Sequence, residues 1–240
     1  MKRILAAVLI LSMVIVSTAF AYDVVDVKGG GTIKGKIKAS TKPQDPVLTI
    51  DKDTEVCGKS QAALMYILSP NLEVKNALVI VEDVKKGKAA PKSDTTIDNK
   101  NCKFEPLVGI AYKGGNFVIK NSDPLLHNTN LGILLQDKRR AVYNLALPRK
   151  DQVITKLIKA AGQHGVKCDA HSWMRAYIYV STHPYVAVTD ASGSFEIKDL
   201  PPGKYKVKIW HEGFADVIKD VEVSADKTAE LNVTLSKTKK

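Results

Sequence analysis

Short runs of alternating apolar and polar residues make up most of the chain, and Gly, Pro, Asn and Asp separate them. In residues 204–211, Tyr205, Val207 and Ile209 alternate with lysines, and residues 175–180 alternate in the same way. A period of two is typical of strands with two different faces. Almost no segment has the 3.6-residue period of a long helix. The pattern predicts an all-β protein built from β-sandwiches.

Two segments give sharper predictions. Residues 32–39 predict a first strand with Ile33 and Ile37 on one face and lysines on the other. Residues 76–84 are almost continuously apolar at their centre, which predicts a strand buried on both faces.

The turn sequence DASG at residues 190–193 predicts a hairpin between residues 185–189 and 194–197. Residues 61–69 could form a strand or one turn of helix. Residues 151–161 have helical spacing and could form a short helix or an irregular strand.

The N-terminus has the layout of a secretory signal peptide over residues 1–21. Lys2 and Arg3 precede an apolar run, and Ala19-Phe20-Ala21 is a small-x-small cleavage site. The apolar run is short for a spanning helix, although an uncleaved anchor is the alternative. We expect a periplasmic or secreted protein with no stable membrane insertion after signal cleavage.

The chain is basic, with a net charge of +11 over 240 residues. Lys2 and Arg3 account for two of these charges, so the mature chain keeps +9. A basic exported protein could meet nucleic acid, an anionic surface or an acidic protein. The lysines are spread thinly and no nucleic-acid motif is present, which favours an acidic partner or plain solubility.

The candidate chemistry lies in the sequence CDAHSWM at residues 168–174. Cys168, His171 and Met174 stand at positions n, n+3 and n+6, on a tight loop between two predicted strands. A thiolate, an imidazole and a thioether belong to the ligand set of a mononuclear electron-transfer copper site, which needs one more imidazole. His127, in a turn-rich stretch 41 residues before Cys168, is the candidate.

The cysteine count supports a free thiolate at this loop. The three cysteines are Cys57, Cys102 and Cys168, and an oxidising compartment favours pairing two of them. Because Cys168 has the metal-type context, we expect a Cys57–Cys102 disulfide.

Other interpretations compete with copper. Zinc could take Cys168 and two histidines, Met174 could be ordinary core, and Cys168 could be a nucleophile paired with His171. No oxyanion-type motif accompanies the cysteine, so we expect no enzyme. His164 and His183 are expected to be loop residues, and His211 is expected to be at a solvated strand end.

Residues 93–180 resemble the cupredoxins, the small blue copper proteins. The resemblance rests on Asn121-Ser122-Asp123 followed by His127-Asn128, and much later on Cys168-x-x-His171-x-x-Met174. The ligand loop is most similar to that of amicyanin, with Ala170 and Ser172 where amicyanin has prolines. Residues 102–106 and the Gly114-Gly115 turn are similar to the opening strands of a cupredoxin.

The resemblance implies a Greek-key sandwich that holds one type 1 copper through His127, Cys168, His171 and an axial Met174. It also implies that Asn128 fixes the loop carrying the cysteine. A redox partner, acidic or a cytochrome, would dock around an exposed His171 edge with Trp173 nearby. The clusters 138–140 and 149–150 would steer it.

The flanking segments resemble a different family, the carboxypeptidase regulatory-like domain, a small transthyretin-like sandwich. The resemblance rests on residues 189–205 (TD…GSF…LPPGKY), on 31–37 (GTIKGKI) and on 76–81 (NALVIV). The simplest arrangement inserts the cupredoxin, residues 93–180, between two halves at 22–92 and 181–240. A tandem arrangement is the alternative.

Together these features predict a periplasmic or extracellular type 1 copper protein that carries single electrons. One alternative is a copper carrier or delivery protein without an electron-transfer role. The other is a β-sandwich binding module without metal, in which the cysteine is structural.

Overall fold

The computed structural model describes residues 22–136 and 138–237, whose regular secondary structure is nearly all β. Among these residues the single α-helix is α1 (Thr54–Cys57). This confirms the all-β prediction. The signal peptide predicted at residues 1–21 lies outside the described residues. Within the described part of the chain, no helix has the length and apolarity to span a membrane.

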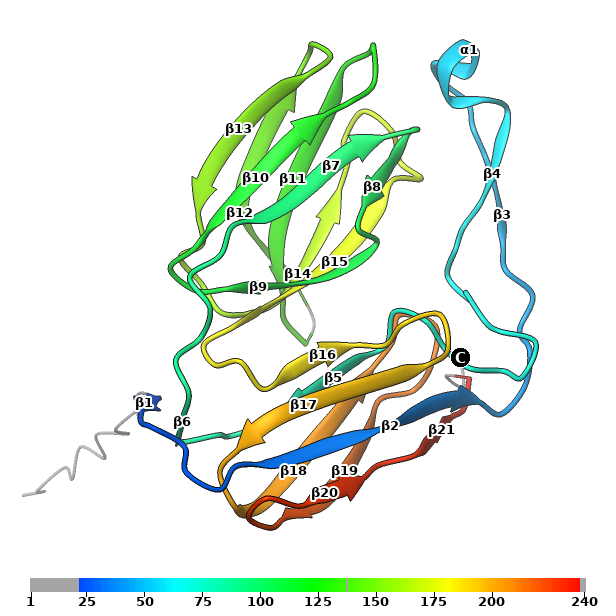
Figure 1. The fold of residues 1–240 in the computed structure, drawn as a ribbon. Helices are drawn as coiled ribbons and strands as arrows, with labels where there is room; N and C mark the ends of the chain where they lie inside the picture. The colour runs from blue at the N-terminus through cyan, green and yellow to red at the C-terminus, as the bar shows by residue number, and fades with distance from the viewer. Residues whose placement is uncertain (1–21, 137, 238–240) are drawn as a thin grey trace, which may run out of the picture.

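The first sandwich combines strands from both ends of the chain (Figure 1). One sheet has the order β16-β5-β18-β19, and the other has β17-β2-β20 with β21 also beside β2. In the first of these sheets β5 lies between β16 and β18, which come more than a hundred residues later in the sequence. The strands are β2 (Gly31–Ala39), β5 (Leu78–Val81), β16 (Val186–Val188), β17 (Ser194–Leu200), β18 (Gly203–Trp210), β19 (Val217–Val223), β20 (Thr228–Glu230) and β21 (Val233–Leu235).

The second sandwich is formed by the residues between these two sets. Its sheets have the orders β13-β10-β7-β8 and β12-β11-β14-β15-β9. A short parallel pair, β1 (Asp23–Val24) with β6 (Lys86–Gly87), precedes it. The strands are β7 (Thr95–Lys100), β8 (Lys103–Glu105), β9 (Val108–Tyr112), β10 (Asn116–Asn121), β11 (His127–Leu134), β12 (Arg139–Leu147), β13 (Gln152–Leu157), β14 (Gly162–Lys167) and β15 (Arg175–Ser181).

A third apolar cluster joins the two sandwiches. All four residues of β5 are buried: Val79 and Val81 face the core of the first sandwich, while Leu78 and Ile80 face β9 and β15 of the second. The predicted burial of both faces is therefore correct, and its cause is the contact between sandwiches. On that contact the ring centroids of Tyr177 and Trp210 lie 5.0 Å apart.

An arm between β2 and β5 leaves the first sandwich and extends alongside the second (Figure 1). It consists of β3 (Val47–Thr49), α1 and β4 (Ser60–Ala62), and its two strands pair only with each other. Ile50 and Cys57 of the arm are buried in the apolar core of the second sandwich. The arm therefore links the two sandwiches near the ligand loop.

The predicted hairpin at residues 190–193 is wrong in its pairing. The turn forms, with the Gly193 N–H donating to the Asp190 carbonyl at 3.0 Å. However, β16 pairs with β5 and β17 pairs with β2, so the turn crosses from one sheet to the other. Of the two ambiguous segments, residues 152–157 form a strand, and 60–62 form the short β4.

Candidate metal centre

The segment from Cys168 to Met174 is a short loop that connects β14 to β15. Lys167 lies opposite Arg175 where the two strands end. The Cys168 N–H donates to the Met174 carbonyl at 3.3 Å, and the Met174 N–H donates to the His171 carbonyl at 3.0 Å. These two bonds close the loop and fix the directions in which its side chains leave the backbone.

The structure brings three of the four predicted ligands together. His127 begins β11, which pairs with β14, so it lies beside the ligand loop. Its Nδ1 is 3.1 Å from Nδ1 of His171, and the Cys168 Sγ is 3.5 Å from the same His171 nitrogen. The three ligand atoms lie within 4.8 Å of one another, and all three side chains are buried.

Met174, the fourth predicted ligand, follows in the same loop. It is 2 % exposed and belongs to the same apolar cluster as Cys168. Its backbone is bonded to both Cys168 and His171. Its role as axial ligand stays a prediction.

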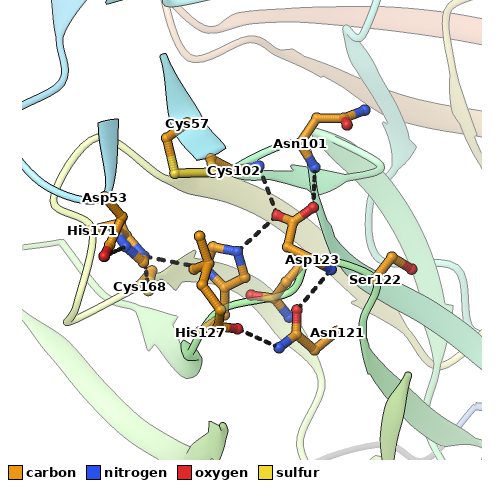
Figure 2. A network of polar contacts seen from close by, with 12 residues as sticks. Asp53, Cys57, Asn101, Cys102, Asn121, Ser122, Asp123, His127, Cys168 and His171 are labelled. Carbon is orange, nitrogen blue, oxygen red and sulfur yellow. Dashed lines mark hydrogen bonds and ion pairs between the residues drawn. A yellow bond between two sulfur atoms is a disulfide. The ribbon is translucent and has the colours of Figure 1, made fainter. Parts of the chain in front are cut away.

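Each histidine is bound on its other ring nitrogen by a carboxylate (Figure 2). The His127 Nε2 lies 2.8 Å from Asp123 Oδ2, and the His171 Nε2 lies 2.9 Å from Asp53 Oδ2. Asp123 also accepts the backbone N–H groups of Asn101 and Cys102, both at 2.8 Å. Burial lowers the pKa of His127, although Asp123 opposes the shift, so the imidazole is neutral at physiological pH.

The two carboxylates determine the tautomers of the histidines. An ionised carboxylate only accepts hydrogen bonds, so each Nε2 carries a proton, and in a neutral imidazole this leaves the free lone pair on Nδ1. The two Nδ1 atoms lie 3.1 Å apart beside a thiol, in a site closed to water, so in the neutral imidazoles their lone pairs converge. Two such lone pairs repel each other unless a cation lies between them. The arrangement is that of carboxylate–histidine–metal sites.

The distances and the donor chemistry fit a transition-metal ion. Two nitrogens at about 2.0–2.1 Å from one metal are roughly 3–3.5 Å apart at the angles of a four-coordinate site. The observed 3.1 Å falls within that range. Two imidazoles and a thiolate suit copper better than a hard cation such as magnesium.

Asn128 connects the strand of His127 to the ligand loop. Its backbone N–H donates to the Cys168 Sγ at 3.3 Å, and its Oδ1 accepts the Asp169 N–H at 3.1 Å. Its Nδ2 is bound by Asn144. Asn128 therefore fixes the loop that carries the cysteine, as the resemblance implied.

The Cys57–Cys102 disulfide forms as predicted and leaves Cys168 as the free cysteine of the described chain. The disulfide lies against the candidate metal centre, because Asp123 accepts the N–H of Cys102. The Trp173 Nε1–H donates to the Cys102 carbonyl at 3.2 Å, and its ring centroid is 5.0 Å from that of His171. The disulfide and Trp173 together form one wall of the site.

The docking edge expected at His171 is not exposed in the structure. His171 is 1 % exposed and Trp173 is 8 % exposed, so neither offers an edge to a partner. Residues 138–140 lie at the Leu134 end of β11, which is roughly 24 Å from His127 at about 3.4 Å per residue. Residues 149–150 are exposed and lie at the His127 end, where the Arg149 carbonyl accepts the Asn121 Nδ2–H at 3.3 Å.

Two of the other three histidines differ from expectation, whereas His183 lies in a loop as expected. His164 lies within β14 rather than in a loop. His211 does follow a strand, but it is 4 % exposed rather than solvated. His183 is in the connection between β15 and β16. In the described chain none of them joins the cluster of His127, Cys168 and His171.

Sequence reasoning missed both carboxylates. Asp123 stands four residues before His127, and that local spacing could have indicated it. Asp53 is 118 residues from His171, and no local pattern connects the two.

Comparisons with known proteins give one family-model match and several similar solved structures. Residues 174–236 match the family model of the carboxypeptidase regulatory-like domain. The match begins at the end of the ligand loop and includes β15 as well as strands of the first sandwich. No curated protein matches the chain.

Solved structures of copper proteins are similar over part of the chain. A novel purple cupredoxin from Nitrosopumilus maritimus is 21 % identical over 37 % of this chain and 100 % of that one, with a TM-score of 0.32. A reduced Cu(I) form of an amicyanin mutant is 17 % identical over 43 % of this chain and 98 % of that one, also at 0.32. A copper-containing nitrite reductase from Thermus scotoductus is 16 % identical over 39 % of this chain and 24 % of that one, at 0.31.

Proposed function

We propose that this protein is a type 1 copper protein that carries single electrons between redox partners outside the cytoplasm. His127, Cys168 and His171 would hold one copper ion, and Met174 would be its weak axial ligand. Bound copper would supply reversible one-electron chemistry. In this proposal the protein is a carrier and not an enzyme.

The main support for this proposal is the arrangement of the ligand atoms: the Nδ1 atoms of two histidines point at one buried position beside a thiol. Asp123 and Asp53 orient the two buried imidazoles by hydrogen bonds to their Nε2 atoms, and Asn128 orients the thiol. Such a framework holds the ligands in one arrangement for both oxidation states. Little reorganisation would then accompany the gain or loss of an electron.

The surroundings of the site support this function. Trp173, Met174 and the disulfide belong to an apolar cluster that excludes water from the ligands. The exposed Arg149 and Lys150 lie at the same end of the sandwich and would steer an acidic partner.

The test is copper loading of the mature protein followed by visible spectroscopy and voltammetry. We expect one copper per chain, an intense thiolate-to-copper band in the visible region and a reversible one-electron wave. Cys168→Ser should abolish the band. A colourless Cu(II) protein would exclude a type 1 site, and copper binding without a reversible wave would favour the delivery role instead.

A further inference from the structure

The group that covers His171 comes from the arm and not from either sandwich. Asp53 lies between β3 and α1, and its Oδ2 accepts the Nε2–H of His171 at 2.9 Å (Figure 2). The His171 side chain is 0 % exposed, whereas the Asp53 side chain is 39 % exposed. The carboxylate therefore lies between the imidazole and the solvent.

The arm is anchored to the second sandwich on both sides of Asp53. Three residues before it, Ile50 is buried in the apolar cluster that contains Trp173 and Met174. Four residues after it, Cys57 is joined to Cys102 by the disulfide. These anchors hold the arm against the ligand loop.

The backbone at Asp53 is also well defined. Its φ of 51° lies in the left-handed region, which Asp adopts more readily than most residues. Its carbonyl accepts the N–H groups of Val56 at 3.1 Å and Cys57 at 2.9 Å. The turn thus presents the carboxylate of Asp53 to His171 from a fixed position.

We infer that Asp53 is a positioning residue of the copper site, delivered by the arm to orient His171 and close its edge. The inference rests on the proposed function. By accepting the Nε2–H, Asp53 holds His171 in the tautomer whose Nδ1 can bind metal. Its negative charge favours Cu(II) over Cu(I), because the more highly charged ion gains more from a nearby anion.

Closure by the arm also changes where electrons can enter. The edge of His171 is not available to a partner, so a partner at this end would contact the arm and the partly exposed Asp53 instead. The path from the site to the surface then runs through the hydrogen bond between His171 and Asp53.

Two substitutions separate orientation from charge. Asp53→Asn keeps an oxygen that can accept the Nε2–H but removes the charge. Asp53→Ala removes both. Glu55→Gln is the matched control, since Glu55 is an exposed acid on the same arm and loses the same charge without a contact to the site.

The first measurement uses the protein without metal. Diethylpyrocarbonate modification, mapped by mass spectrometry, reports the accessibility of each histidine. We expect His171 to be protected in the wild type and in Glu55→Gln, and to react severalfold faster in Asp53→Ala. Equal protection in all variants would show that Asp53 does not close this edge.

The second measurement uses copper-loaded protein. We expect Asp53→Ala to lower Cu(II) affinity roughly 10–100-fold, as substitutions behind a ligating histidine do. Asp53→Asn should raise the reduction potential with a smaller loss of affinity, and Glu55→Gln should change neither appreciably.

The outcomes distinguish this inference from the proposed function. If the wild type is blue and Asp53→Ala matches it in affinity and potential, the role of Asp53 is overturned and the copper site stands. If the wild type binds no copper, the proposed function and the inference both fall.

Discussion

The backbone N–H of Asn128 donates to the Sγ of Cys168 at 3.3 Å, so the residue after one proposed ligand holds the sulfur of another. The Asn128 side chain strengthens the same link by accepting the Asp169 N–H at 3.1 Å. Two segments separated by 40 residues are thereby held as one unit.

Asn128→Ala should weaken copper binding while the fold persists. The substitution keeps the backbone N–H but removes the side-chain bond to Asp169, so the ligand loop becomes more mobile. Loss of such an outer contact costs about 10–100-fold in metal affinity. Competition with a chelator measures the affinity, and thermal unfolding of the metal-free protein is the control. Unchanged affinity would contradict the role of Asn128.

Replacing Cys57 and Cys102 together by Ala should lower stability. The disulfide closes a loop with a sequence separation of 45 residues. The chain-entropy treatment assigns such a loop roughly 4 kcal/mol, through restriction of the unfolded chain. Denaturant unfolding of the double variant against the oxidised wild type measures the loss. Because the disulfide also anchors the arm, His171 should become more reactive in this variant, and its continued protection would show that apolar contacts alone hold the arm.

Acid should destabilise the protein partly through His211. Burial lowers the pKa of His211 to about 4, and its Nδ1 accepts the Gly213 N–H at 3.1 Å. The unfolded state, with an ordinary pKa near 6.5, binds the proton more readily, so stability falls as the pH drops from about 6.5 toward 4. The loss below that window is about 3 kcal/mol at 1.36 kcal/mol per pKa unit.

His211→Asn is the variant that tests this effect, because an Asn oxygen can take the place of Nδ1 as acceptor. Unfolding free energies measured between pH 4 and pH 7 should show a shallower dependence than in the wild type. An identical slope would assign the acid sensitivity to other groups.

Ile80→Ala should destabilise the contact between the sandwiches. Ile80 is 4 % exposed and packs in the cluster shared by β5, β9 and β15. Truncating a buried Ile to Ala costs about 2–5 kcal/mol. Ile218→Ala is the matched control: Ile218 is 54 % exposed, so its loss should be within about 0.5 kcal/mol. Calorimetry should also show whether the two sandwiches then unfold separately, and equal effects of the two substitutions would contradict a structural contact.

Much of the fold follows from local patterns. Alternation in residues 175–180 indicates a strand, and the apolar run near Leu78 indicates burial on both faces, because side-chain period and burial are local properties. The strand pairing predicted around residues 190–193 was wrong because pairing is not a local property. A turn sequence determines the local chain reversal, but the partner of each strand depends on the sheets available on either side.

The sequence alone was sufficient to propose three soft or imidazole ligands on one loop, the identity of the free cysteine and the distant His127. These depend on residue type, spacing and the pairing of the other two cysteines. Only the tertiary structure could show the carboxylates behind both imidazoles and the closure of the His171 edge. Asp53 reaches His171 across 118 residues because an arm of one sandwich packs onto the other. A long-range contact of this kind arises from the packing of whole elements, and no periodicity in the chain records it.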